Sequence, residues 1–384
     1  MLLRTITIGL LSFLTLIDLF GSQAILPQLT AFYETDPASM GLAVNASTFG
    51  MAAAGLVVAL LSRHIDRVKG IWLSLALLSI PTTLLGFVDE LTIFTWLRVA
   101  QGALMATAFT LTMSYLAEEC SAAEAAGAMA AYITGNVLSN LLGRLLAANF
   151  ADWLGLSISF WLFAALNLAG AILAYLCLAR TEPREVNPDG PTVMQVWKIH
   201  LLNPRLQASF ILGFLILFIF LSVFTYVNFV LSAEPFALSG RQLGLVYFVF
   251  LPAVFTTPLA GKMVSSRGVY FGFSMSMTLA FVGLLALLTS SLALMILGLA
   301  AVGVGTFCAQ AVVSGQIGSF ATADRATASG LYLTSYYLGG LIGAAMIGRI
   351  FTTGGWNSAV YVLLAITAVS VVVARPLGRP IPAT

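Results

Sequence analysis

Charged residues are scarce in this sequence. Only 8% of its 384 residues are Asp, Glu, Lys or Arg, whereas soluble domains contain roughly 25%. Hydrophobic residues make up 60% of the chain, so water is not the main solvent of its folded state. The formal net charge of +2 comes with no basic tract and no zinc-ligand spacing, which argues against nucleic acid as a partner.

Cysteine and histidine are also scarce, and this excludes several kinds of chemistry. Cys120, Cys177 and Cys308 stand alone in or beside apolar runs, without the close pairing of a metal or redox motif. The two histidines, His64 and His200, lie far from any plausible nucleophile. The glycine loop with which ATPases bind phosphate is missing as well. We therefore expect no metal site, no cofactor and no enzyme activity.

Long apolar runs recur along the whole chain, and each can cross about 30 Å of hydrocarbon. Because an unpaired backbone group in lipid costs several kcal/mol, and because the runs lack the alternation of a barrel strand, each span is predicted to be helical. The first run reaches Thr30 without a cleavage pattern, so we expect a span rather than a signal peptide. The sequence predicts an all-α integral membrane protein with twelve transmembrane helices, near residues 5–30, 39–61, 71–88, 92–117, 126–150, 157–179, 207–232, 241–264, 270–289, 291–313, 327–351 and 356–374.

Residues 181–206 contain four prolines and many of the charges near the middle of the chain. This composition predicts a linker between an N-terminal six-helix bundle, residues 1–180, and a C-terminal one, residues 207–384. With the N-terminus inside, only Arg241 lies in a segment on the outer face, so the positive-inside rule places both termini and the linker in the cytoplasm. The inner segments hold thirteen Lys and Arg residues: Arg4, Arg63, Arg67, Lys69, Arg180, Arg184, Lys198, Arg205, Lys262, Arg267, Arg325, Arg375 and Arg379.

The two predicted bundles also match each other at a shift of 203 residues. Six spans per repeat preserve orientation, so the pattern indicates a parallel duplication. The tryptophan pair is the rarest of the matches. The matching pairs are Gly41 with Gly244, Gly102 with Gly305, Gly127 with Gly330 and Trp153 with Trp356.

The loop after the second span reads SRHIDRVKG from Ser62 to Gly70. It resembles the G-x-x-x-D-R-x-G-R loop of the major facilitator superfamily, of which the Asp66-Arg67 core is kept. The resemblance implies that the acid caps a neighbouring helix and that the two residues form a conformational latch for the outward-facing state. The alternative is a basic loop that only fixes topology.

The fourth span contains Arg98, Gln101 and Gly102 in the order R-x-x-Q-G. This is similar to a signature of the same superfamily, whose arginine is linked to proton transfer. Arginine within lipid is costly and is rarely kept without a role. Both motifs together imply the major facilitator fold, in which two bundles rock about a central cavity.

The fifth span resembles the glycine-rich fifth helix of the drug/proton antiporter branch, although the Gly-Pro of that branch is missing. Together with TYVNFVLSAEPFALS in span seven and SGLYLTSYYLGG in span eleven, it is closest to the YnfM-like and arabinose-efflux-like group of the superfamily. From the residues themselves, the glycines are predicted to let helices pack closely. The helix-packing candidates are Gly102, Gly135, Gly143, Gly339 and Gly343.

Asp18 is the single acidic residue inside a predicted span, at a depth similar to that of Arg98. A carboxyl group held in lipid near a cation can gain or lose a proton as a cavity opens, so we predict that the two residues couple transport to protons. The alternative is a static pair. Arg349 is expected to snorkel to the interface, whereas Arg144 either does the same or faces the cavity and meets an anionic group of the solute.

Uncharged polar residues near mid-membrane suit a substrate site between the two halves. Each could instead form a helix-to-helix hydrogen bond, worth about 0.6 kcal/mol on average. With Arg144, the predicted cavity residues are Gln23, Asn136, Asn140, Tyr226, Tyr336 and Tyr337.

The sequence thus predicts a secondary active transporter in the inner membrane, working as a monomer and driven by the proton gradient without a cofactor. We expect efflux of a small organic solute by rocking of the two bundles, on the family resemblance alone. The alternatives are a facilitator or proton symporter that imports a nutrient, and an exporter of an anionic, metal-chelating metabolite. A membrane enzyme or receptor is disfavoured because no cluster of His, Asp or Glu lies at membrane depth.

Overall fold

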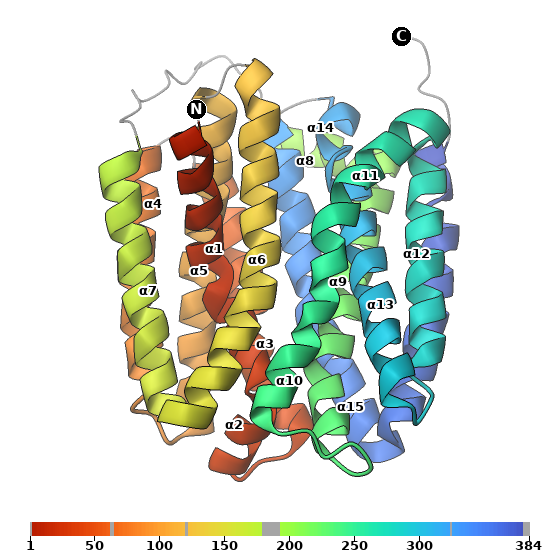
Figure 1. Ribbon diagram of the computed structural model, residues 1–384. Helices are drawn as coiled ribbons and strands as arrows, with labels where there is room; N and C mark the ends of the chain where they lie inside the picture. Colours follow the sequence, from red (N-terminus) through yellow and green to blue (C-terminus); the bar gives the residue numbers. More distant parts are fainter. Residues whose placement is uncertain (1, 62–64, 120–121, 179–192, 323–324, 379–384) are drawn as a thin grey trace. The chain divides into compact units, whose positions relative to one another are not determined.

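The computed structural model describes residues 2–61, 65–119, 122–178, 193–322 and 325–378, and every regular element in these ranges is a helix (Figure 1). Seven of the helices are long and apolar enough to cross a membrane, or eight if a pair bent by 43° around position 258 counts as one span. The residue at that position is a proline, which interrupts helix hydrogen bonding. The predicted all-helical membrane architecture is confirmed.

The chain forms two compact units. Unit 1 contains Met1–Asp189 together with Asn228–Phe248, and unit 2 contains Gly190–Val227 and Val249–Thr384. Residues 228–248, which the sequence analysis assigned to the C-terminal bundle, therefore group with the helices of the N-terminal half. Of the predicted linker, residues 181–192 lie outside the described residues and the part from Val193 to Leu202 forms helix α8.

Unit 1 is built on six long helices, of which α1 runs beside α6, α3 beside α5, and α4 beside both α5 and α7 (Figure 1). Because the number of long helices is even, α7 ends at the edge of the unit where α1 begins. The short helix α2, Leu26–Phe32, joins the first two. The six are α1 Leu2–Ala24, α3 Pro37–Leu61, α4 Arg67–Leu84, α5 Leu91–Glu119, α6 Ala122–Leu154 and α7 Leu156–Cys177.

The first membrane helix is shorter than the sequence predicted, since α1 ends at Ala24 and not at residue 30. Ile25 leaves helical geometry, and α2 then starts with Pro27 in its first turn. Proline has no N–H to donate, so the carbonyl of Gln23 four residues earlier is released from helix bonding. That carbonyl instead accepts a hydrogen bond from the side chain of Asn228.

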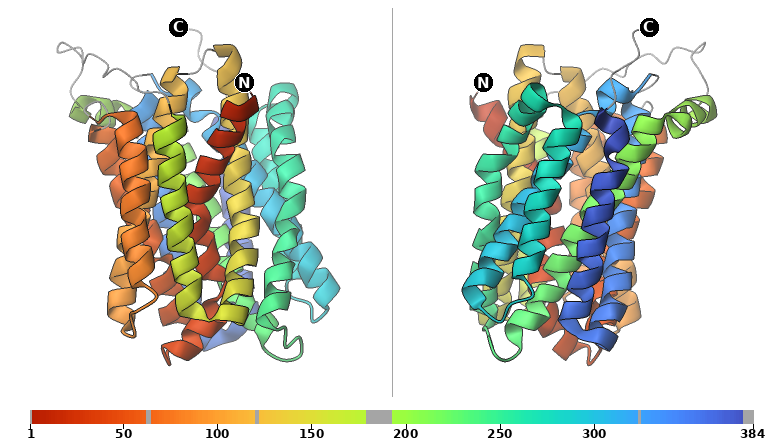
Figure 2. Two further views of the ribbon diagram at one scale, coloured as in Figure 1. Left: turned by 60° about the vertical axis from the view of Figure 1, so that its left-hand side comes forward. Right: turned by 90° about the vertical axis from the view of Figure 1, so that its right-hand side faces the viewer.

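The C-terminal half repeats this order of helices, and Figure 2 shows α12 and α13 side by side. Helix α15 is a merger of two spans, because Gly355 inside it has non-helical angles. The elements are α9 Pro204–Ser232, α10 Gly240–Val246, a 3₁₀ turn Tyr247–Phe250, α11 Leu251–Arg267, α12 Val269–Ala286, α13 Leu292–Ser314, α14 Ile317–Phe320, α15 Arg325–Val373 and a final 3₁₀ turn Arg375–Gly378.

The structural repeat does not keep the constant shift of 203 residues. The tight turns before the last helix of each half contain Gly155 with φ 87° and Gly355 with φ 74°, left-handed angles that favour glycine. These positions are 200 apart, whereas the starts of α5 and α13 at Leu91 and Leu292 are 201 apart. Trp153 and Trp356 consequently lie on opposite sides of equivalent turns, and their match in the sequence is not a structural one.

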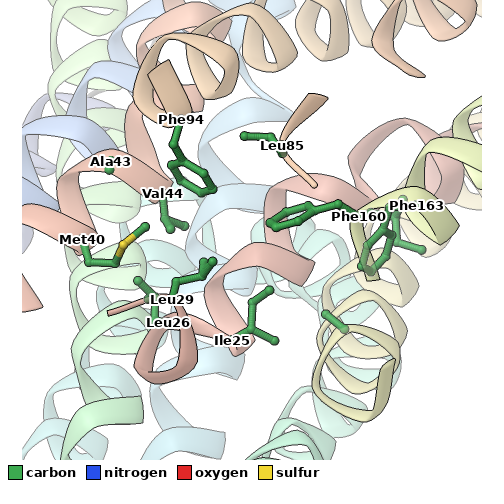
Figure 3. Close-up of a cluster of buried hydrophobic side chains, with 12 residues drawn as sticks. Ile25, Leu26, Leu29, Met40, Ala43, Val44, Leu85, Phe94, Phe160 and Phe163 are labelled. Atoms are coloured by element: carbon green, nitrogen blue, oxygen red, sulfur yellow. The ribbon is translucent and has the colours of Figure 1, made fainter. Parts of the chain in front are cut away.

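An apolar cluster fixes the end of unit 1 where α1 meets α2 (Figure 3). Ile25 and Leu26 pack there with Val44 of α3, Phe94 of α5 and Phe160 of α7, all at most 4% exposed. Since lipid is as apolar as these side chains, the gain comes from close packing rather than from escape from water. The cluster packs together α1, α3, α5 and α7, four helices that also carry residues of the candidate site.

Glycines lie where neighbouring helices approach most closely. A Cβ on Gly102 would be 1.8 Å from the carbonyl oxygen of Ser47, and one on Gly339 would be 2.0 Å from that of Phe214. No larger residue fits such contacts without moving a backbone. The other predicted packing glycines face a backbone carbonyl oxygen in the same way: Gly135 that of Gly9, Gly143 that of Ile17, and Gly343 that of Phe218.

Candidate functional site

Arg98 is the centre of a buried polar network in unit 1. Its side chain is fully buried, and its guanidinium donates to four oxygens. Nε bonds the backbone oxygen of Val44 at 3.0 Å and Nη1 that of Asp18 at 3.3 Å. Nη1 also bonds Gln101 Oε1 at 2.6 Å, and Nη2 bonds Ser47 Oγ at 3.1 Å. One cation thereby ties α1 and α3 to α5.

Asp18 lies beside Arg98 as its depth predicted, but their contact goes through the Asp18 backbone. The carboxyl group is 3% exposed, and its Oδ2 has no hydrogen-bond partner. Within the described part of the chain, the ion pair that the structure contains joins Lys69 to Asp66 and does not involve Asp18. The Asp18 carboxyl group is within range of the Arg98 charge and of the Asn167 side chain of α7.

A hydroxyl group connects Asn167 back to Arg98. Thr82 of α4 donates to the backbone oxygen of Leu78 at 2.8 Å. The same Oγ1 accepts from Gln101 Nε2 at 2.7 Å and from Asn167 Nδ2 at 3.1 Å. The carboxamide oxygen of Asn167 has no hydrogen-bond partner. Five helices therefore contribute to a buried ring of polar groups around Asp18.

A second network surrounds Arg144, which is fully buried in α6. Nη2 donates to Gln23 Oε1, and Nε donates to Asn140 Oδ1 at 3.0 Å. The guanidinium also lies 4.4 Å from the ring centroid of Tyr247 and 5.7 Å from that of Phe20, distances suited to cation–π attraction. Arg144 therefore faces the interior of unit 1. The sequence left open whether Arg144 snorkels to the lipid interface or faces inward, and its burial rules out the lipid interface.

The same network reaches the segment 228–248. Gln23 Nε2 donates to Asn45 Oδ1 at 2.8 Å, and the Gln23 carbonyl accepts from Asn228 Nδ2 at 2.9 Å. This is the carbonyl that Pro27 released. Asn228 Oδ1 in turn accepts from the Tyr247 hydroxyl. Gln23 is thus the residue through which α1, α3, α6 and the segment 228–248 are bonded to one another.

The predicted cavity residues fall into both units. Gln23, Asn140 and Arg144 meet in unit 1, and Asn136, one turn before Asn140, has a buried Oδ1 without a partner. The other three lie in unit 2. Tyr226 is fully buried and donates to the backbone oxygen of Ala344 at 2.6 Å, while Tyr336 and Tyr337 pack edge to face with centroids 5.4 Å apart.

The predicted latch residues lie at the start of α4. Asp66 caps this helix by accepting from the Lys69 backbone N–H at 3.0 Å, and its Oδ2 is 3.6 Å from Lys69 Nζ. Arg67 is 9% exposed and bonds the backbone oxygen of Ile65 at 3.2 Å. Asp66 therefore caps the helix that follows it. Ser62–His64 of the same motif lie outside the described residues.

Sequence reasoning missed several members of the two networks. Asn45, Asn167 and Asn228 are at most 1% exposed, and each is the only carboxamide in the interior of its apolar span. That was an available signal, because a buried amide in lipid requires partners. Tyr247 gave no such signal. Arg349, for its part, is exposed, which agrees with snorkelling.

Comparison with known proteins identifies the family to which this chain is similar. The model of the Major Facilitator Superfamily matches residues 8–248 and 227–383. The inner membrane transport protein YnfM of Escherichia coli is 29% identical over 366 residues, covering 94% of this chain and 87% of YnfM. The uncharacterised MFS-type transporter YybF of Bacillus subtilis is 26% identical, covering 89% of this chain and 85% of YybF.

Solved structures support the fold. A bacterial homologue of the human lysosomal transporter Spinster, in an inward-facing, occupied conformation, superposes with a TM-score of 0.78 at 16% identity, covering 99% of this chain and 98% of the homologue. The nucleoside transporter NupG, as its D323A mutant, gives 0.77 at 13% identity over 98% of this chain and all of NupG. At these identities the likeness concerns architecture and not the transported solute.

Proposed function

The chain belongs to the Major Facilitator Superfamily and is a transporter of that type, and we propose that it exports a small organic solute in exchange for protons. It would work as a monomer that alternates access by rocking of its two bundles, and it would use the proton gradient with no cofactor. The name of its relative YnfM, an inner membrane transport protein, supports the inner membrane as its location. The excess of Lys and Arg in the inner loops supports cytoplasmic termini.

Proton coupling rests on one observation, the buried carboxyl group of Asp18. Asp18 is 3% exposed, and one of its two carboxyl oxygens has no hydrogen-bond partner, which leaves that oxygen available to a proton. The cation of Arg98 stays fixed by four other oxygens, so its charge remains in place whichever form Asp18 takes. Intramembrane carboxyl groups in such surroundings are typical of proton pathways.

The substrate would be bound partly by the Arg144 network. Gln23, Asn136 and Asn140 offer both donors and acceptors close to one cation, which suits an anionic or zwitterionic solute. Tyr226, Tyr336 and Tyr337 would contribute from the second half, while Asp66 and Arg67 would act as the latch. An anionic metabolite that chelates metals and a neutral sugar are both compatible with this mixture of groups.

A transport assay tests the proposal. A thermal-shift screen of purified protein with sugars, cationic dyes, organic acids and chelators would first identify a ligand, because ligands of the folded state raise the melting temperature. In proteoliposomes, a pH gradient should then drive accumulation of that ligand by the wild type. Asp18→Asn should keep counterflow exchange and lose the accumulation.

Asp89→Asn is the matched control, because Asp89 is an exposed loop carboxylate and its loss should leave accumulation unchanged. If Asp18→Asn accumulated the ligand as well as the wild type, the assignment of Asp18 would be wrong. If the wild type exchanged the ligand but ignored the pH gradient, the protein would be a facilitator.

A further inference from the structure

We propose that Asn140 binds a carboxylate group of the solute, and that the solute is an organic carboxylate which also carries an amine or a hydroxyl group. The inference deepens the proposed function by naming the class of solute, and it rests on that function. It narrows the candidates, because neutral sugars and purely cationic compounds lack a carboxylate. The observation behind it is that the Asn140 side chain is fully buried while its Nδ2 has no hydrogen-bond partner.

Arg144 fixes the orientation of the Asn140 amide. The Nε–H of Arg144 can only donate, and Nε lies 3.0 Å from Asn140 Oδ1. The amide oxygen must therefore face the guanidinium, and the NH₂ group must face away from it. Gln23, the other amide on Arg144, has both ends occupied, since its Oε1 accepts from Arg144 and its Nε2 donates to Asn45. Of these two amides, Asn140 is the one with a donor left for a solute.

An anionic acceptor suits this donor best. A buried donor without an acceptor is destabilising, so binding of an acceptor to Asn140 Nδ2 removes a penalty. The cation of Arg144 lies on the other side of the same amide, and buried hydrogen bonds that form a chain polarise and strengthen one another. A carboxylate on Nδ2 completes a chain from guanidinium through amide to anion. Its single negative charge balances one cation, whereas a phosphate monoester carries about −1.5 to −2.

A second pair of unpartnered polar groups lies one helix turn away. Asn136 precedes Asn140 by four residues, which places it on the same face of α6 at about 6 Å along the axis. Its Oδ1 is buried without a donor. Ser12 of α1 is fully buried with an unpartnered hydroxyl, and it faces the preceding residue, Gly135, on which a Cβ would be 2.9 Å from Ser12 Cβ. Because an amide oxygen only accepts, this end suits an amine or hydroxyl group and disfavours a second carboxylate.

Thermal-shift measurements on the full-length protein with four related compounds test the inference. Butyrate offers the carboxylate alone, butyramide is its neutral amide, butylamine offers the amine alone, and γ-aminobutyrate offers both charged groups. A compound that binds the folded state raises the melting temperature, and a tighter one raises it more at equal concentration. We expect γ-aminobutyrate to stabilise the wild type most and butyrate less, while butyramide and butylamine give no shift.

Asn140→Asp is the decisive variant. It keeps an oxygen for Arg144 Nε and replaces the NH₂ donor with a second oxygen, so the shifts with butyrate and γ-aminobutyrate should be lost. Asn136→Leu should reduce the shift with γ-aminobutyrate to that with butyrate and leave the butyrate shift unchanged. A merely structural role of either residue would change the melting temperature of the ligand-free protein without distinguishing between the compounds.

Asn149→Asp is the matched control. Asn149 also belongs to α6, and its Nδ2 donates to the Leu145 carbonyl at 2.8 Å. This variant should keep the wild-type order of the four compounds. If Asn140→Asp failed to fold, the order of the compounds on the wild type and their response to Asn136→Leu would still decide the question.

The outcomes separate this inference from the proposed function. The assignment is wrong if butyramide or butylamine stabilises the wild type as much as γ-aminobutyrate, if neither carboxylate gives a shift, or if Asn140→Asp keeps the shifts. A different ligand whose proton-driven accumulation depends on Asp18 would still support the proposed function in that case. Conversely, carboxylate selectivity together with normal accumulation by Asp18→Asn would keep the binding site and overturn the proton coupling.

Discussion

The two halves of this transporter share a helix order but have very different interiors. Arg98 is the eighth residue of α5, which begins at Leu91. The eighth residue of α13 is Leu299, 201 residues later. Arg144 lies directly after Gly143, whose structural counterpart 200 residues later is Gly343, followed by Ala344. Both counterparts are fully buried, so apolar residues replace the cations at equivalent depth.

Asp18 has an apolar counterpart as well. Gly143 packs against Ile17, and its counterpart Gly343 packs against Phe218. This pair of contacts aligns α1 with α9 at a shift of 201 residues, so Ile219 occupies the position equivalent to Asp18. Instead of charges, unit 2 contains an aromatic cluster in which the rings of Phe220, Phe224 and Phe250 lie 4.6 to 5.7 Å apart by centroids.

The comparison teaches which residues the fold requires. Unit 2 forms the same succession of helices with leucine, isoleucine and alanine at the positions of Arg98, Asp18 and Arg144. The buried charges of unit 1 are therefore not needed to build a six-helix bundle. Charges buried within lipid are costly. Among the side chains that the structure describes, the buried Asp and Arg residues all lie in unit 1, which indicates that they serve transport.

The largest effect is expected from Arg98→Leu, which gives α5 the leucine found at the equivalent position of α13. The backbone oxygens of Asp18 and Val44 would keep the hydroxyl groups of Ser22 and Ser47 as donors, but Gln101 Oε1 would lose the guanidinium that donates to it. Each unsatisfied buried group costs about 1–3 kcal/mol. We expect transport to be lost and the melting temperature in detergent to fall strongly. Arg349→Leu removes an exposed cation of unit 2 and should change neither. Normal transport by Arg98→Leu would show that the network around it is dispensable.

The second test asks whether close helix packing is common to both halves. Gly102→Ala and Gly339→Ala each put a Cβ within about 2 Å of a carbonyl oxygen, at 1.8 and 2.0 Å, so we expect each to destabilise its unit by about 1–3 kcal/mol. Gly55→Ala and Gly261→Ala are the controls, since a Cβ there meets nothing within 4 Å. They should leave the melting temperature unchanged or raise it. Equal melting temperatures for all four variants would contradict a packing role.

The span map could be predicted because apolar run length and charged loops are local properties of a sequence. The predicted span 92–117 differs from α5 by only one or two residues at each end, and Pro27 was a visible signal for the early end of α1. The likeness of the halves was also readable, although with the wrong constant shift. Insertions of one or two residues in loops change the register from one helix to the next.

The contacts inside the site could be predicted only in part. Depth along a helix placed Asp18 level with Arg98, but it gives no information on rotation about the helix axis. That rotation decides that Arg98 bonds the Asp18 backbone and that Asn167 faces the carboxyl group. One partner of Gln23, Asn228, is distant in the sequence. It reaches Gln23 because residues 228–248 pack in unit 1. Such pairings are set by packing and have no periodic pattern.

The mildest test compares the two equivalent N-caps. Asp36 caps α3 by accepting from the N–H groups of Ala38 and Ser39 at 2.8 and 3.1 Å, and Ser239 caps α10 by accepting from Gln242 at 3.4 Å. Hydrogen bonding to Ser39 lowers the pKa of Asp36. Its contribution to stability is therefore present above the ordinary aspartate pKa of about 3.9 and is lost as the pH falls towards the lowered value.

Asp36→Ser should consequently keep the melting temperature at neutral pH, because serine and aspartate are similar N-caps. It should remove part of the decline in acid, an effect of a few tenths of a kcal/mol for so exposed a group. The reverse exchange, Ser239→Asp, should add an acid-dependent contribution to the stability of the α10 N-terminus. Melting curves between neutral pH and about pH 3 would check both, and identical acid profiles for wild type and Asp36→Ser would mean that this cap does not contribute to acid sensitivity.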